Sequence, residues 1–283
     1  MPHIPQDIID VILNHLTGLH GSSAVLKTCA LVSRCFRSHS QRLSFRSIMV
    51  DAVDWNPGPL SRLHLVLKAN PHLGTHVRHL SLFLRPRGSS QISETLVDTL
   101  VWFTGVSSCA WIEHGVSGPS RENIRIRLYQ FLRLPSLVKV FVQGADPVLI
   151  DFLASCEQLK SLTVNVCSVN LESISLGDAS ISPTHSTSAS GLLEELIVDT
   201  SHIVALIHSL ASQSSQLGIS RLRKLTVART KLSLGFDKVR KACQQVLDLC
   251  AESLEELTIG KHLHIIMPSL LSFHYRTGQP NVC

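Results

Sequence analysis

The sequence predicts an α/β protein in which a short unit of three helices precedes an irregular solenoid with a parallel strand face and outer helices. Three observations predict it. Apolar residues recur at helical spacing through the first part of the chain. A six-residue motif, apolar-x-x-apolar-x-apolar, then returns between residues 77 and 259. Helical stretches separate its copies, and such an alternation at regular intervals is typical of stacked repeats.

The composition indicates a large buried core and argues against nucleic-acid binding. Of the 283 residues, 44% are hydrophobic and 17% are charged, which excludes global disorder. The net charge is +5, and the basic residues are dispersed apart from Arg34, Arg37, Arg42 and Arg46. No aromatic residues alternate with these basic residues to stack on bases. We therefore expect a core-forming protein that binds no nucleic acid.

No segment predicts secretion or a membrane span. Acidic Asp7 and Asp10 interrupt the first apolar stretch, and no basic segment precedes it. No run of about 18 apolar residues exists anywhere in the chain. The eight cysteines form no Cys-x-x-Cys pair, so we expect reduced thiols. These features predict a cytoplasmic or nuclear protein without membrane contact.

The first fifty residues predict three short helices. The apolar residues of the first helix form one stripe: Ile4, Ile8, Ile9, Ile12, Leu13 and Leu16. Ser22 or Ser23 suits the cap of a second helix, and residues 34–44 predict a third. The segment "FRSIMV" at 45–50 then becomes extended. A unit of this size cannot bury all its apolar surface, so it needs either a partner or the rest of the chain.

The six-residue motif predicts a strand at each copy. Its last three residues alternate as a short strand, and its first residue anchors the turn into that strand. The clear copies begin at six positions: Val77, Leu137, Leu159, Leu193, Leu222 and Leu254. A less regular copy begins at Leu171, and the gap between Leu82 and Leu137 has room for a degenerate copy near 101–112.

A helix is expected over 60–69, before the first copy, and further helices between the copies, over 89–106, 120–133, 146–156, 202–214 and 237–251. A doubly wound α/β sheet also alternates strands with helices. It does not require a leucine-anchored motif of constant internal spacing, so we favour a leucine-rich-repeat solenoid.

No pattern of catalytic or metal-binding residues emerges. His72, His76 and His79 lie close in sequence, as do His262 and His264, but neither set has carboxylates or cysteines at zinc-like spacing. No Gly-x-Ser-x-Gly elbow, phosphate-binding loop or dinucleotide fingerprint is present. We therefore predict that the chain is not an enzyme and carries neither a metal nor a cofactor.

The N-terminal segment "IPQDIIDVILNHL", followed by "LKTCALVSRCFRSHSQRLSFRSI", resembles an F-box. Ile4-Pro5 stands for the family's leucine-proline start, Leu31-Val32-Ser33-Arg34 for its middle and residues 43–48 for its close. Phe36 stands where the family usually has tryptophan, which keeps an aromatic ring of smaller area. The resemblance covers about one sixth of the chain. With the repeats, the whole plan resembles the F-box proteins with irregular leucine-rich repeats that are abundant in mushroom-forming fungi.

The resemblance implies a division of the chain into four parts. An F-box-like helical domain occupies residues 1–50, and residues 51–75 hold a linker and the first helix of the solenoid. The irregular leucine-rich-repeat domain spans 76–263 and includes a Ser-rich loop at 177–191. Residues 264–283 form a tail that we expect to be flexible.

The same resemblance implies a substrate-receptor subunit of a Skp–cullin–F-box type ubiquitin ligase. The N-terminal helices are expected to bind a Skp-type adaptor, and through it a cullin, using Ile4, Pro5, Ile8, Ile9, Ile12, Leu13, Leu31, Val32 and Phe36. The open strand face is expected to bind a protein substrate through Phe83, Phe141, Gln143, Thr163, Asn165, Asp199 and Thr226.

The alternative is a leucine-rich-repeat scaffold without ubiquitin function, whose N-terminal helices cap the first repeat. An exposed apolar stripe favours the adaptor, and a covered stripe favours the cap.

Overall fold

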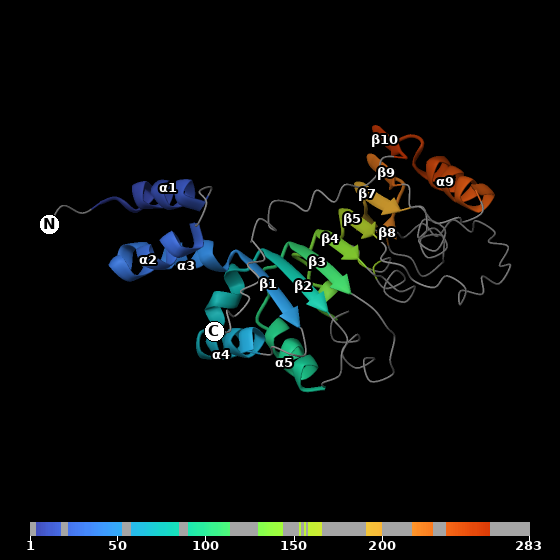
Figure 1. The fold of residues 1–283 in the computed structure, drawn as a ribbon. Helices are drawn as coiled ribbons and strands as arrows, with labels where there is room; N and C mark the ends of the chain where they lie inside the picture. The colour runs from blue at the N-terminus through green and yellow to red at the C-terminus, as the bar shows by residue number, and fades with distance from the viewer. Residues whose placement is uncertain are drawn as a thin grey trace, which may run out of the picture.

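The computed structural model describes residues 4–17, 22–52, 58–84, 90–113, 130–143, 153, 156, 158–165, 191–199, 217–228 and 236–260. Within these residues the protein has the predicted α/β fold, built on an eight-stranded sheet whose strand pairs are all parallel. The strand order is β1-β2-β3-β4-β5-β7-β9-β10 (Figure 1), which is also the order along the chain. Each new strand therefore extends the same edge of the sheet.

The strands of the sheet are short. They are β1 (Ser47–Ala52), β2 (His79–Leu84), β3 (Ser108–Glu113), β4 (Lys139–Gln143), β5 (Ser161–Asn165), β7 (Glu195–Asp199), β9 (Lys224–Ala228) and β10 (Glu256–Ile259). A separate parallel pair joins β6 (Gly191–Leu192) to β8 (Leu217–Gly218).

The helices that precede the sheet are α1 (Gln6–Thr17), α2 (Ser22–Val32) and α3 (Arg34–Phe45), which confirms the three predicted helices. Later in the chain come α4 (Gly58–Ala69), the 3-10 helix η1 (Pro71–His76), α5 (Ser90–Leu100) and α9 (Phe236–Cys250). The expected helix over 89–106 ends early, because residues 101–107 form turns into β3. Most of the other expected helical stretches, the loop at 177–190, the motif copy at Leu171 and the tail lie outside the described residues.

Each clear copy of the motif forms a strand, and two further copies complete the sheet. The predicted degenerate copy is Val106-x-x-Cys109-x-Trp111, which forms β3. The extended segment at 45–50 forms β1 and is itself a copy, because Phe45, Ile48 and Val50 occupy the apolar positions. The sheet therefore starts inside the range predicted for the helical domain.

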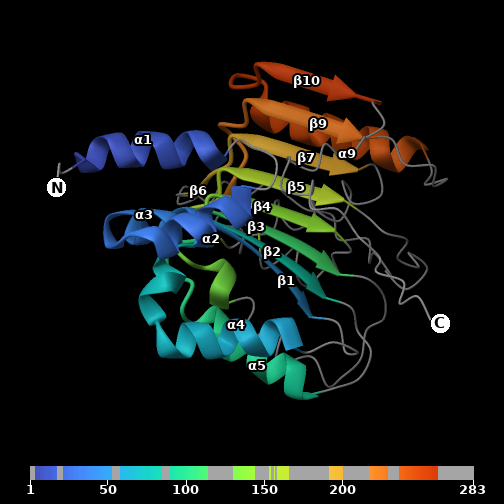
Figure 2. The same ribbon diagram turned by 60° about the vertical axis from the view of Figure 1, so that its left-hand side comes forward.

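The apolar positions of the motif build the main core. The fourth and sixth positions pair across the whole sheet, so that Leu80 aligns with Cys109 and Leu82 with Trp111. These side chains are buried together with residues of α4, α5 and α9, which pack on one face of the sheet (Figures 1 and 2). At the last strand the same positions are exposed, Leu257 by 45% and Ile259 by 61%.

A repeated hydrogen-bond pattern keeps the turns before the strands in register. The carbonyl oxygen at the second motif position accepts the N–H groups of the second and third positions of the next copy. Arg46 O, for example, accepts from Arg78 N at 2.9 Å and from His79 N at 3.0 Å. The same pattern continues from copy to copy as far as Arg223 O, which accepts from Glu255 N and Glu256 N. Side chains at these positions therefore form rows that cross the strands.

The N-terminal helices have a small core of their own. Ile9, Leu13 and Leu26 are buried in a cluster separate from the main core, with Phe36 and Leu43 packed against it. α1 packs on α2 and α3, and α3 also contacts η1 and β1. Figure 2 shows these helices at the end of the sheet where the strands begin. Only Arg46 separates the end of α3 from the start of β1.

Candidate binding surfaces

α1 carries apolar side chains on two sides. Ile9 and Leu13 face inward and are 2% and 0% exposed. Ile4, Ile8 and Ile12 recur at four-residue spacing and are about half exposed, at 51%, 48% and 46%. The predicted stripe therefore divides into a core part and an exposed part.

The remaining residues predicted to contact an adaptor divide in the same way. Leu31 and Val32, at the end of α2, are 83% and 73% exposed. Pro5 is exposed, and Phe36 is partly buried against the helical core. The exposed apolar surface of the unit, hereafter the helical apolar surface, consists of Ile4, Pro5, Ile8, Ile12, Leu31 and Val32.

Two further exposed apolar residues of these helices are absent from the predicted set of adaptor contacts. Val11 on α1 is 65% exposed and Val25 on α2 is 38% exposed. Val11 follows Ile8 by three residues and Ile4 by seven, so the helical spacing of the stripe already predicted it.

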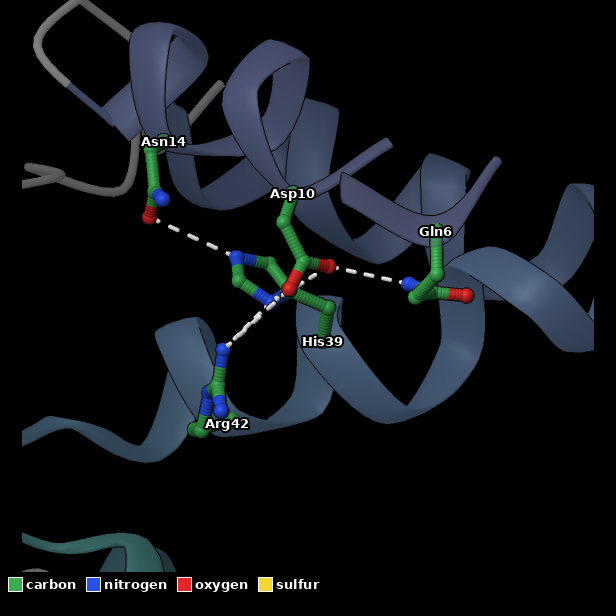
Figure 3. A network of polar contacts seen from close by, with 5 residues as sticks. All are labelled: Gln6, Asp10, Asn14, His39 and Arg42. Atoms are coloured by element: carbon green, nitrogen blue, oxygen red, sulfur yellow. Dashed lines mark hydrogen bonds and ion pairs between the residues drawn. The ribbon is translucent and has the colours of Figure 1, made fainter. Parts of the chain in front are cut away.

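A polar network joins α1 to α3 (Figure 3). Asp10 accepts a hydrogen bond from the side-chain amide of Gln6 at 2.9 Å, and its carboxylate lies 3.8 Å from the Arg42 guanidinium. His39, which is 5% exposed, lies between Asp10 and Asn14, with 2.9 Å from its Nδ1 to Asp10 Oδ1. The apolar core holds the two helices together without fixing their orientation, and these directional polar contacts favour one orientation of α1 on α3.

Two groups compete for His39 Nδ1. Arg42 Nη2 lies 2.6 Å from this nitrogen and can only donate, whereas Asp10 Oδ1 lies 2.9 Å from it and can only accept. The other ring nitrogen, Nε2, lies 3.4 Å from Asn14 Oδ1. Burial lowers the pKa of His39 from its ordinary value of 6.5, and the charge of Arg42 adds to the lowering against the opposing effect of Asp10. A proton on Nδ1 would favour Asp10 and displace Arg42.

The strand face opposite the helices carries the third and fifth motif positions. The fifth positions form one row across the sheet: Met49, Ser81, Ala110, Phe141, Thr163, Ile197, Thr226 and Thr258. Among the predicted substrate contacts, Phe141, Thr163 and Thr226 lie in this row and are partly exposed. Phe83 and Asn165, also partly exposed, lie two residues further along β2 and β5.

Two predicted substrate contacts are buried and are removed from the candidate surface. Gln143 is 9% exposed and Asp199 is 1% exposed, and both already interact within the chain. Ile112 and Ala228 pair with them in the same row and are each 2% exposed. The prediction failed because alternation along a strand gives the side of the sheet on which a residue lies, not whether other groups cover it.

Of the histidines considered for metal binding, His262 and His264 lie outside the described residues. The ring centroids of His72 and His76 are 6.3 Å apart. Within the described parts of the chain, no group of three or more His, Cys, Asp or Glu side chains is placed to hold a metal ion. Burial raises the pKa of Cys109 to about 12 and that of Cys156 to about 11, so both remain protonated thiols near neutral pH.

Outside comparisons give no family for the chain. No family model matches it and no curated protein matches it. The search for a membrane span, restricted to the described residues, finds no helix long and apolar enough to cross a bilayer.

Proposed function

We propose that this chain is a substrate-receptor subunit of a Skp–cullin–F-box type ubiquitin ligase. The observation that carries the proposal is the helical apolar surface, which remains exposed after the small helical core is filled. Its order of elements is that of the F-box resemblance, with Ile4-Pro5 before α1 and Leu31-Val32 at the end of α2. These residues would bind the Skp-type adaptor, while Ile9, Leu13 and Phe36 would hold the unit together.

The exposed fractions allow an estimate of what adaptor binding contributes. Ile4, Ile8, Ile12, Leu31 and Val32 together leave the equivalent of about three full side chains uncovered. Burying them contributes roughly 5–9 kcal/mol. Association itself costs about 4–15 kcal/mol, so a stable complex also requires polar contacts from the adaptor.

A leucine-rich-repeat solenoid is the form of α/β fold that we propose for the rest of the chain. Strands that follow one another in chain order, with no reversal, support it, because a doubly wound sheet reverses direction at a switch point. The hydrogen-bond ladder at the turns supports it as well, since each copy repeats the contacts of the previous one.

Within this proposal the chain contributes position and no covalent chemistry. The helical unit would bind the adaptor and the strand face would hold a protein substrate near the conjugating enzyme. Holding two reactants at fixed positions raises their effective concentration.

The alternative is a repeat scaffold whose N-terminal helices cap the first strand. The contacts of α3 with η1 and β1 favour this alternative. One observation weighs against it. The helical apolar surface remains exposed, whereas a cap would turn its apolar side chains toward the first strand. A pocket of about 290 Å³ beside β1 is lined by Ser44 and Phe45 of α3 as well as by Ser47–Asp51 and Leu60, so it does not distinguish the two alternatives.

The test is copurification of the full chain with a Skp-type adaptor after co-expression. Ile8→Asp with Ile12→Asp places two charges on the helical apolar surface, and we expect it to abolish copurification. The matched control is Leu65→Asp with Leu249→Asp, which changes two exposed apolar residues on α4 and α9. Circular dichroism verifies the fold of each variant. If the folded wild-type chain does not retain the adaptor, the ubiquitin proposal is wrong and the scaffold alternative stands.

A further inference from the structure

The turn ladder arranges two rows of side chains at the ends of the strands where they begin. The second motif positions form the turn row: Arg46, Arg78, Ser107, Val138, Lys160, Glu194, Arg223 and Glu255. The third positions form the first strand row: Ser47, His79, Ser108, Lys139, Ser161, Glu195, Lys224 and Glu256. The ladder uses only backbone atoms, so folding leaves the side chains at these positions free to vary.

From β5 to β10 the charges in these rows compensate one another. Lys160 Nζ lies 3.0 Å from Glu194 Oε1, and Lys224 Nζ lies 3.0 Å from Glu256 Oε2. Arg223 pairs with Glu255 at 3.7 Å. In the described part of this half, the rows hold three cations and four carboxylates. A bound anion would meet more negative charge than positive charge there.

From β1 to β4 the same rows carry basic residues and no carboxylate. Arg46, Arg78, His79 and Lys139 lie here, hereafter the basic surface, and Arg46, Arg78 and Lys139 make no ion pair with any described residue. The Arg78 guanidinium is held by backbone carbonyls instead, donating from Nη1 to Gly105 O at 2.8 Å and to Thr75 O at 2.9 Å. Carbonyl dipoles fix its position but leave its charge uncompensated.

The pKa values of the neighbouring histidines are lowered by nearby positive charges as well as by burial. Burial lowers the pKa of His79 from its ordinary value, and the charges of Arg46 and Lys139 lower it further. Burial likewise lowers the pKa of His76, followed by the effects of His72, Arg42 and Arg78. Arg46 and Lys139 therefore both lie near His79, and Arg78, the residue next to His79, acts on His76.

We propose that the basic surface binds a short acidic segment of a protein, lying extended across the starts of β1 to β4. Three strand spacings of about 4.8 Å give a span of about 14 Å. An extended chain rises about 3.3 Å per residue, so five residues cover this span and present alternate side chains to the surface. Carboxylates at three alternate positions would meet Arg46, Arg78 and Lys139, and arginine is suited to paired contacts with a carboxylate.

The occupant that the charge pattern favours is a short acidic peptide segment rather than nucleic acid. A longer polyanion would run from the basic surface onto Glu194, Glu195 and the other carboxylates of the second half. The inference deepens the proposed function and rests on it, in that the acidic segment would belong to the protein substrate of the receptor.

Fluorescence anisotropy with the full chain and a labelled nine-residue peptide, alternating Ser and Glu, tests the inference. We expect saturable binding at 50 mM NaCl that weakens as salt rises. Arg46→Gln with Lys139→Gln should weaken binding at least tenfold. The matched control is Arg223→Gln with Lys224→Gln, which alters the same two rows where the cations are already paired, and it should change the affinity less than twofold.

Three outcomes would overturn the inference. They are the absence of saturable binding by the folded chain, equal weakening by the two double variants, and tighter binding of an oligothymidylate than of the peptide at the same residues. Adaptor copurification is measured on the same preparations. Adaptor binding without peptide binding refutes only this inference, and peptide binding without adaptor binding refutes only the ubiquitin proposal.

Discussion

Leu13 and Ile12 are neighbours on α1 with opposite exposure, and their truncation separates folding from binding. Leu13 is fully buried in the helical core, so Leu13→Ala should cost about 2–5 kcal/mol in the stability of the helical unit. Ile12 is 46% exposed, and alanine favours a helix more than isoleucine does. Ile12→Ala should therefore leave stability within about 0.5 kcal/mol of wild type.

For adaptor binding we expect the opposite order, with a direct loss of affinity for Ile12→Ala and none for Leu13→Ala. A partner can bury only the exposed half of Ile12, which is worth about 0.7–1.5 kcal/mol, so the affinity of Ile12→Ala should fall about 3-fold to 12-fold. Leu13→Ala removes no exposed surface. It weakens binding only to the extent that the helical unit unfolds.

Hydrogen exchange of the α1 amides and calorimetric titration with the adaptor measure the two effects separately. A loss of 2 kcal/mol corresponds to about 30-fold faster exchange through unfolding of the unit. Leu13→Ala should show at least this acceleration, and Ile12→Ala should exchange as wild type does. Unchanged affinity of Ile12→Ala, together with unchanged affinity of Ile8→Ala, would refute the assignment of the helical apolar surface as the adaptor contact.

Three further predictions concern the stability of the fold. Gly74→Ala should lower it by about 1–3 kcal/mol in denaturant unfolding, because a Cβ there would clash with the Trp102 carbonyl oxygen; an unchanged midpoint would contradict this. Leu162→Ala, in the middle of the sheet, should cost about 2–5 kcal/mol, and Leu257→Ala, in the exposed last strand, less than half as much, so equal costs would count against the stacked core. The pKa of His39 is lower in the folded unit than in the unfolded chain, so the unfolded chain binds more protons below about pH 6.5 and the unit loses stability there. The α1 amides should therefore become less protected from exchange as pH falls from 7.5 to 5.5. His39→Gln should reduce this dependence, and an unreduced dependence would contradict the role of His39.

The sequence was sufficient to predict the core of the sheet, because one motif sets both burial and register. Its apolar positions predicted six strands directly. β3 was predicted because the stretch between Leu82 and Leu137 is long enough to hold another copy of the motif. β1 was expected only as an extended segment. Phe45, Ile48 and Val50 complete the same motif. This copy was missed because it begins at the end of α3 and lies within residues 1–50, which were assigned to the helical domain.

The candidate surfaces were predictable only in part, since exposure depends on what packs above a side chain. Ile8 and Ile9 fall in one broad helical stripe, yet one is half exposed and the other is buried in the helical core. Gln143 and Asp199 have the alternation of an open face and are covered. The basic surface was invisible for a different reason. Arg46, Arg78 and Lys139 are separated by tens of residues and come together only through the strand order.

The junction between α3 and β1 joins the two proposed surfaces in one rigid element. α3 ends at Phe45, β1 begins at Ser47, and the backbone of Arg46 between them is held by hydrogen bonds from Arg78 and His79. Phe45 packs into the main core, while Leu43, two residues earlier, packs into the helical core. A partner bound to the helical apolar surface would therefore keep a fixed orientation to a ligand on the basic surface. Insertion of a flexible Gly-Ser segment after Ser44 would leave Leu43 with the helical core and keep Phe45 and Arg46 with the sheet. It should therefore preserve both binding events and reduce ubiquitin transfer to a bound substrate, because transfer depends on the position of the substrate as well as on its capture.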